Sequence, residues 1–308
     1  MRDNRRYVLG AVLLAFALFL GACGSGGDDD DSGDAGGGDG SKGSVTVGSD
    51  SFPEAQIVGE MYALVLENAG FEVERQLDIQ SREVRLPAME SGEIDVAPEY
   101  VASLLSVVDP EADLTGDATE VAERLTAPLQ EKGLEILTPS AAIDTNAFAV
   151  TQETAGEFGL VTMSDLADVA GDMVLGAPTE CPDRPFCIPG LKETYGVEFR
   201  EFKELEYGAA TVQALQAGAV DVGLIFSTDP LVSENELVVL DDDKSLQSAD
   251  NIVPLVSSEL PQEAKDLLDE VSATLTTEEI TDLNRRVAID LEDAADVARE
   301  FLEGKGLL

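Results

Sequence analysis

The sequence predicts an α/β protein built from two similar lobes, each with a doubly wound sheet, joined by a hinge of two strands. First, Ala88–Tyr100 aligns without gaps on Ala214–Phe226: both contain a helix end, a glycine turn, an Asp-Val strand and a final aromatic residue. Second, expected strands and helices alternate, which is typical of parallel sheets connected by helices. Third, 308 residues with 44% hydrophobic content suffice for two cores.

Hydrophobic periodicity and turn residues give the expected elements in order. Strands are expected at 44–48, 71–77, 94–97, 134–137, 144–150, 173–176, 199–202, 220–226, 237–240 and 251–256. Helices are expected at 55–68, 81–89, 101–107, 118–132, 164–170, 191–195, 207–216, 261–272, 277–290 and 293–303. The chain would cross between lobes twice, so we expect lobe one at 44–143 plus 252–308 and lobe two at 144–251.

The repeated segment indicates where a ligand would bind. Tyr100 and Phe226 each follow a predicted strand, and open α/β sheets bind ligands at the carboxyl ends of their strands. Asp95 and Asp221 hold equivalent positions, and we expect them to bond backbone groups at their turns. The alternative is that these are two ordinary helix–turn–strand units, which any α/β protein can contain.

The N-terminus has the features of an export signal. Arg2, Arg5 and Arg6 precede an apolar stretch at 7–20 that is too short to span a bilayer. The following Leu-Gly-Ala-Cys-Gly resembles a bacterial lipobox, which implies that 1–22 is a signal peptide and that Cys23 is lipidated. A plain signal peptide with a chance cysteine is the alternative. The protein is therefore expected outside the cytoplasm, anchored to the outer face of the cell membrane.

The stretch that follows, 23–43, is rich in Gly, Ser and Asp and contains four consecutive aspartates, Asp28 to Asp31. Such a composition cannot bury a core, so we expect a disordered acidic tether. The whole chain has 19 Lys+Arg against 62 Asp+Glu, a formal charge of −43. This charge disfavours nucleic acid as a partner.

The chain contains no His, the commonest general base and metal ligand. We expect no cofactor and no metal. Cys181 and Cys187 flank a five-residue segment, and in an exported protein this predicts a disulfide that closes a short loop. A metal site would need more thiols or His, and a redox pair is the remaining alternative.

Several motifs, in order along residues 44–308, resemble the quaternary-amine substrate-binding proteins of ABC importers, of the glycine betaine/choline/carnitine type. They are Gly48-Ser-Asp-Ser-Phe-Pro-Glu54, Gly59-Glu-Met-Tyr-Ala63, Ser81-Arg-Glu-Val84, Ser91-Gly-Glu-Ile-Asp95, Pro98-Glu-Tyr100, Arg184 with Pro189-Gly-Leu191, and Phe226-Ser-Thr-Asp229. The resemblance implies a type II periplasmic-binding-protein fold that closes on its ligand and docks on a membrane permease. We expect a monomer.

The resemblance also implies site residues. A trimethylammonium group cannot donate hydrogen bonds, so aromatic faces hold it by cation–π contacts. Tyr100 matches a box aromatic, Ser103 stands where a ligand-contacting Thr is usual, and Phe226 replaces a usual Tyr. Arg184 matches a carboxylate-binding Arg. Alternatively, Tyr100 packs the cleft wall, Arg184 forms a surface pair with Glu180 or Asp183, and Phe226 is core.

Three positions depart from the family pattern. Asn146 and Asp250 stand where box tyrosines are usual, and Asp50 replaces a common Lys. Asn146 and Asp250 are candidates for ligand contact or for hydrogen bonding in the hinge. Two aromatic rings are lost and two negative charges gained, so a different small polar or cationic amine is an alternative ligand.

Two further classes of function are alternatives to a transport receptor. One is an envelope hydrolase with paired carboxylates, Glu99 with Asp50 or Asp229 with Glu54. It is disfavoured because the chain has no nucleophile elbow, no P-loop and no His for a serine triad. The other is a receptor that serves as a sensor for a membrane kinase. The sequence therefore predicts a binding protein and not an enzyme.

Overall fold

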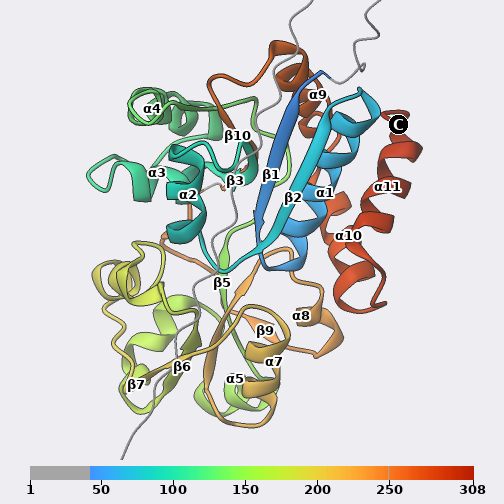
Figure 1. Cartoon of the computed structure of the whole chain (residues 1–308). Helices are drawn as coiled ribbons and strands as arrows, with labels where there is room; N and C mark the ends of the chain where they lie inside the picture. The colour runs from blue at the N-terminus through green and yellow to red at the C-terminus, as the bar shows by residue number, and fades with distance from the viewer. Residues whose placement is uncertain (1–41, 249) are drawn as a thin grey trace, which may run out of the picture. The chain divides into compact units, whose positions relative to one another are not determined.

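A computed structural model describes residues 42–248 and 250–308 of the chain. Two five-stranded sheets with surrounding helices form the fold (Figure 1). We call the part that carries the first sheet lobe one and the part that carries the second sheet lobe two. The predicted signal peptide, Cys23 and nearly all of the predicted tether lie outside the described residues.

The strands are β1 Ser44–Asp50, β2 Glu72–Ile79, β3 Val96–Tyr100, β4 Leu134–Ile136, β5 Asn146–Val150, β6 Val174–Ala177, β7 Glu201–Glu204, β8 Val222–Phe226, β9 Val238–Val239 and β10 Ile252–Ser257. The α-helices are α1 Pro53–Asn68, α2 Arg82–Glu90, α3 Val101–Val108, α4 Ala118–Gln130, α5 Gln152–Phe158, α6 Ile188–Gly190, α7 Ala209–Gln216, α8 Leu231–Glu234, α9 Gln262–Ser272, α10 Thr277–Ala288 and α11 Ala294–Lys305. Short 3₁₀ turns lie at Met163–Asp168, Ala170–Asp172 and Cys181–Asp183, and a π-type turn lies at Leu191–Tyr195.

The strand order is β2-β1-β3-β10-β4 in the first sheet and β7-β6-β8-β5-β9 in the second. The inner strands pair in parallel, as predicted. However, β10 runs antiparallel to β3 and β4, and β5 runs antiparallel to β8 and β9. The sheets are therefore mixed, because the strands that follow the two crossings enter them from the hinge side.

The two crossings are bonded to each other. Ile143 forms an antiparallel bridge with Asn251, and the backbone N–H of Asp144 donates to the carbonyl of Asp250 at 3.1 Å. The N–H of Ile252 donates in turn to the carbonyl of Ala142 at 3.0 Å. The predicted two-strand hinge thus exists as a short ribbon, while the exact lobe boundaries at 143/144 and 251/252 stay a prediction.

The predicted repeat is structural. Gly92 and Gly218 both have positive φ, 77° and 64°, which glycine adopts without strain. The carboxylate of Asp95 accepts from the N–H of Thr46, and that of Asp221 accepts from the N–H of Val174, both at 2.8 Å. Asp95 thus ties its turn to β1 and Asp221 ties its turn to β6, so both bond backbone groups as expected. Pro98 does not end β3, which runs on to Tyr100 opposite β10, where Pro98 faces Pro254.

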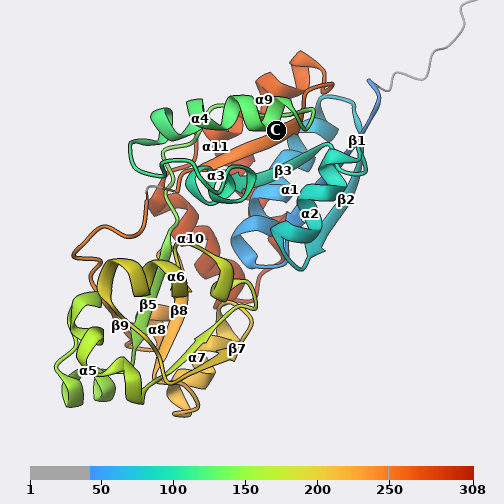
Figure 2. The same cartoon turned by 90° about the vertical axis from the view of Figure 1, so that its left-hand side faces the viewer.

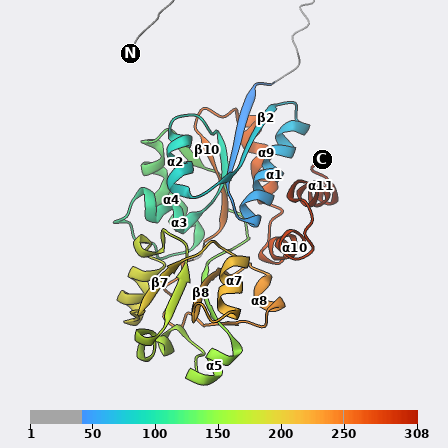
Figure 3. The ribbon, with the colours of Figure 1, turned by 60° about the horizontal axis from the view of Figure 1, so that its bottom comes forward.

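The core of lobe one lies between its sheet and the helices α1, α9, α10 and α11. Buried residues of these four helices form one cluster with β1 and β3, and Figures 2 and 3 show the C-terminal helices beside α1. The three predicted C-terminal helices are confirmed. A second cluster packs α3 and α4 against β3 and β10.

The predicted helix at 164–170 is wrong, because short 3₁₀ turns replace it, and α5 and α8 were not predicted. Within the described residues, no helix is long and apolar enough to cross a membrane.

Candidate functional site

One cavity collects all seven ligand-binding residues that the sequence predicted. Side chains from both lobes line it. The lining residues are Asp50, Ser51, Phe52, Gln80, Ser81, Arg82, Tyr100, Ser103, Asp144, Asn146, Glu180, Arg184, Phe186, Tyr207, Phe226 and Asp250. Tyr100 at the end of β3 and Phe226 at the end of β8 occupy equivalent ends of the repeated strands, where open sheets bind ligands.

Four of the five aromatic side chains that line this cavity lie close to one another. The ring of Phe52 is near the other three: its centroid lies 6.2 Å from that of Tyr100, 6.0 Å from that of Tyr207 and 5.0 Å from that of Phe226. Tyr207 stacks on Phe226 at 4.5 Å with an interplanar angle of 20°. The rings thus form one aromatic cluster that can present ring faces to a small cation, while the stacked pair Tyr207 and Phe226 leaves no space between its own two rings.

Phe52 and Tyr207 were not predicted as site residues. Phe52 lies in the loop between β1 and α1, and Tyr207 precedes the N-cap of α7, so both rings reach the cavity from loops. Phe52 stands within the first family motif, which was the available signal in the sequence. Tyr207 stands at the start of the helix that the sequence predicted at 207–216. Phe52 and Tyr207 thus bring two rings to a cavity in which Asn146 and Asp250 supply none.

Beneath the cavity lies a buried network of alternating charges. Arg82 donates through Nε and Nη2 to Glu99 at 2.8 Å, and Arg85 Nη2 donates to the same carboxylate at 2.8 Å. Arg85 Nε also donates to Asp50 at 2.9 Å. Burial raises the pKa of Glu99, but the charges of the two guanidinium groups outweigh it and lower the pKa to about 2. Asp50 is therefore tied to Arg85, and Glu99 is a structural anion.

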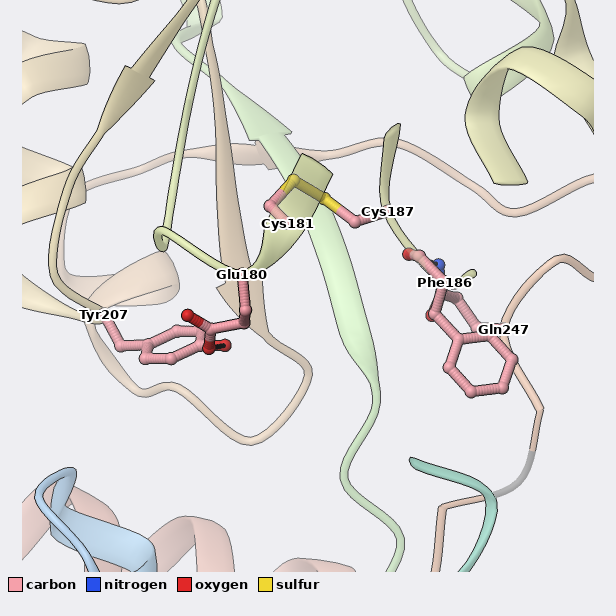
Figure 4. Close-up of a disulfide and its surroundings, with 6 residues drawn as sticks. All are labelled: Glu180, Cys181, Phe186, Cys187, Tyr207 and Gln247. Atoms are coloured by element: carbon pink, nitrogen blue, oxygen red, sulfur yellow. Dashed lines mark hydrogen bonds between the residues drawn. A yellow bond between two sulfur atoms is a disulfide. The ribbon is translucent and has the colours of Figure 1, made fainter. Parts of the chain in front are cut away.

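Arg184 lines the cavity from the loop after β6 and pairs with Glu83 in α2 of lobe one, with Nη2 and Oε1 2.5 Å apart. The alternative pairing with Glu180 or Asp183 is wrong. Glu180 instead accepts a hydrogen bond from the hydroxyl of Tyr207 at 2.9 Å, and Figure 4 shows the two side chains facing each other. The predicted contact of Arg184 with a ligand carboxylate stays a prediction.

Asp250 lies on the hinge and caps α3. Its carboxylate accepts from the backbone N–H of Ala102 at 2.7 Å, from the N–H of Ser103 at 3.0 Å, and from the Ser103 hydroxyl. Burial raises the pKa of Asp250 to about 6, although these hydrogen bonds oppose the rise. Asp250 therefore bonds within the hinge region and also faces the cavity. Asn146 begins β5 and pairs with Phe226 in the sheet.

A second buried cluster joins the lobes behind the rings. The carboxylate of Glu54, at the start of α1, accepts from the Tyr100 hydroxyl at 2.8 Å, from Thr228 Oγ1 at 2.6 Å and from Asn284 Nδ2 at 2.8 Å. Burial raises the pKa of Glu54, and burial together with the charge of Glu54 raises the pKa of Asp144 well above its ordinary value. The cluster orients the phenol of Tyr100 at the cavity wall.

The predicted disulfide is confirmed: Cys181 and Cys187 are bonded, with Cα atoms 5.3 Å apart. The loop that they close carries Arg184 and Phe186, two lining residues, and Figure 4 shows Phe186 beside the disulfide. Gln247 Nε2 donates to the carbonyl of Phe186 at 2.9 Å, so the loop is held from lobe two as well. In the described part of the chain, no group of three or more acidic or Cys side chains is arranged to hold a metal ion.

Two α/β lobes joined by paired crossings, with an aromatic-lined cavity to which both lobes contribute, define a solute-binding protein of the two-lobed type. The chain belongs to the family described as the substrate binding domain of ABC-type glycine betaine transport systems (OpuAC), which matches residues 43–304. This is a family of binding domains and not of enzymes, and the resemblance identified from the sequence motifs is confirmed.

Individual relatives and a solved structure support the family assignment. The chain is 27% identical to the glycine betaine-binding protein YehZ of Escherichia coli over 277 residues, covering 85% of this chain and 90% of the relative. It is 29% identical to a glycine-betaine-binding protein of Pseudomonas aeruginosa, covering 86% and 89%. The crystal structure of a glycine betaine/carnitine/choline ABC transporter protein superposes with a TM-score of 0.67 at 25% identity, covering 85% of this chain and 99% of that one.

Proposed function

We propose that this chain captures a small quaternary-amine osmolyte, of the glycine betaine, choline or carnitine type, and delivers it to an ABC permease. Tyr100, Phe226, Phe52 and Tyr207 form the cage for the ammonium group. Two of these, Tyr100 and Phe226, were predicted from the sequence. The cargo of the relatives and the family description support the assignment.

The observation that carries the proposal is the convergence of the four rings. Phe52 and Tyr100 come from lobe one, and Tyr207 and Phe226 from lobe two, with successive centroids 4.5 to 6.2 Å apart. Each ring face adds about 0.5–2 kcal/mol to the binding of a desolvated cation. Because both lobes supply rings, a bound cation would also stabilise the contact between them.

Boundaries at 143/144 and 251/252 are proposed for the lobes.

Calorimetric titration with glycine betaine, choline, carnitine and proline betaine tests the proposal. Binding of at least one of these compounds supports a quaternary-amine receptor. Where two of them bind, each should displace the other from the same site. Absence of heat and of thermal stabilisation with all of them would refute it. A receptor raises its melting temperature with ligand and releases the ligand unchanged, which also separates this function from the hydrolase alternative.

We further propose that the protein acts outside the cytoplasm as a monomer, held at the outer face of the membrane by a lipid on Cys23. The support is the lipobox-like sequence before Cys23 and the polar composition of 24–43. Mass spectrometry of the native protein tests this proposal. A diacylglycerol on Cys23, absent in Cys23→Ser, is the expected result; an unmodified mature N-terminus would contradict it.

A further inference from the structure

The charges that face the cavity are unequal. Four of its lining residues are carboxylates, Asp50, Asp144, Glu180 and Asp250, and two are arginines, Arg82 and Arg184. Asp50 has a cationic partner in Arg85. In the described parts of the chain, the other three carboxylates take part in no salt bridge, and their hydrogen bonds come from neutral hydroxyl and backbone donors.

Both arginines are already neutralised by carboxylates that do not line the cavity. Arg82 is 8% exposed and holds Glu99 through two of its nitrogens. Arg184 holds Glu83, whose side chain reaches it from α2. A ligand carboxylate entering this cavity would have to compete with Glu83 or Glu99 for its guanidinium partner. It would do so beside Glu180 and Asp250, two carboxylates without a salt-bridge partner, whereas burial and the charge of Glu54 favour the neutral form of Asp144.

We propose that this cavity selects a compact quaternary ammonium ion with net positive charge and a hydroxyl group, the choline class, over zwitterions such as glycine betaine. The inference rests on the proposed function and narrows it. The rings hold the trimethylammonium group, which choline and glycine betaine share. The opposite end decides between them: a hydroxyl donates to a carboxylate acceptor, whereas a carboxylate is repelled by the acids and loses its hydration.

The direct test compares choline with glycine betaine by calorimetry at pH 7.5 in the same buffer. We expect choline to bind at least tenfold more tightly. Equal affinity, or tighter binding of glycine betaine, would overturn this inference and leave the quaternary-amine function intact. Failure of every quaternary amine to bind would instead refute the proposed function, so the two failures are distinguishable.

A charge-neutralising variant tests the mechanism. Glu83→Gln removes the partner of Arg184 and frees its guanidinium group for a ligand carboxylate. We expect the ratio of choline to glycine betaine affinity to fall at least threefold. Glu90→Gln is the matched control, because Glu90 lies on the same helix and pairs with Lys132 away from the cavity. An unchanged ratio in Glu83→Gln, or an equal fall in Glu90→Gln, would contradict the role given to Arg184 and Glu83.

Salt dependence supplies an independent readout. The attraction between a net cation and the acidic cavity is screened by salt, while a zwitterion of zero net charge is less affected. Raising NaCl from 0.05 to 0.5 M should therefore weaken choline binding more than glycine betaine binding. A larger loss for glycine betaine would count against selection by net charge.

Discussion

Thr228 donates a hydrogen bond to Glu54 at 2.6 Å, and this bond connects the loop after β8 in lobe two with the first turn of α1 in lobe one. Both side chains are almost completely buried. The same carboxylate receives the hydroxyl of Tyr100. One carboxyl group thus contributes both to the contact between the lobes and to the orientation of the Tyr100 ring.

Removing the hydroxyl group of Thr228 should lower the free energy of unfolding. Thr228→Val keeps the shape of the side chain but leaves the buried Glu54 with one donor fewer, at a cost of about 1–3 kcal/mol in the free energy of unfolding. Denaturant unfolding at pH 7 measures the change. Thr281→Val, which removes an exposed hydroxyl bonded to its own helix, is the control and should change little. Equal effects of the two substitutions would contradict a special role for Thr228.

The pair Glu54 and Asp144 should make stability fall as pH rises. The pKa of each carboxyl group is raised above its ordinary value of 4.5 and 3.8. The folded state therefore binds protons more tightly than the unfolded chain, and this contribution is full below the ordinary values and lost as pH rises through the raised ones. Asp144→Asn should flatten this part of the pH profile of the unfolding free energy. An unchanged profile in Asp144→Asn would show that Asp144 does not contribute to the pH dependence of the unfolding free energy.

The buried anion Glu99 should be essential for folding. Glu99→Gln leaves Arg82 and Arg85 without their shared counter-ion, at a cost of about 3–5 kcal/mol. Because its pKa is lowered to about 2, the stabilisation is present above the ordinary value of 4.5 and is lost as pH falls through 2. Glu67→Gln, which breaks a partly exposed pair with Arg75, is the control and should cost about 0–1 kcal/mol. Thermal or denaturant unfolding compares them.

Substitution of a cage ring should change the affinity for the ligand more than the free energy of unfolding. Tyr207→Leu removes the ring stacked on Phe226, and we expect the affinity for a quaternary ammonium ligand to fall about 2- to 30-fold. Phe158→Leu, at an aromatic residue that is 43% exposed, is the control and should bind normally. Calorimetry gives both numbers. Normal binding by Tyr207→Leu would exclude Tyr207 from the cage.

Ligand affinity should also follow the titration of Asp250. Its pKa of about 6 means that the carboxylate gains its charge as the pH rises from 5 to 7. A cationic ligand should therefore bind more tightly at pH 7 than at pH 5, and Asp250→Asn should reduce this difference. Titrations at both pH values check the prediction, with the melting temperature of the variant recorded to confirm that α3 keeps its cap. A pH dependence identical to that of the unmutated protein would rule out Asp250 as its source.

The sequence was sufficient for the features that depend on local pattern or on motif order. The repeat with Asp95 and Asp221, the α/β class, the disulfide and the gathering of Tyr100, Arg184 and Asp250 in one cavity are examples. The antiparallel entry of β5 and β10 was missed, because strand direction is set by where a connection returns and not by the strand's own residues.

Three site features depend on contacts between distant segments and could not be derived locally. Glu83 becomes the partner of Arg184 across 101 positions, and Asn284 reaches Glu54 across 230. Tyr207 has no helical or strand periodicity that points to a cavity. Such pairings follow from the packing of the two lobes, which hydrophobic pattern does not encode residue by residue.

The hinge ribbon carries a consequence for the order of events in capture. Asp144 and Asp250 sit on the two bonded crossings, at the pivot about which one lobe would turn against the other. Points at a pivot are displaced least, whereas Phe52 and Tyr207, on opposite lobes, separate as the lobes part. An incoming cation would thus meet the negative charge of Asp250 already in place and its ring cage still incomplete. Electrostatic attraction would then set the association rate, and the meeting of the rings would set how long the ligand stays.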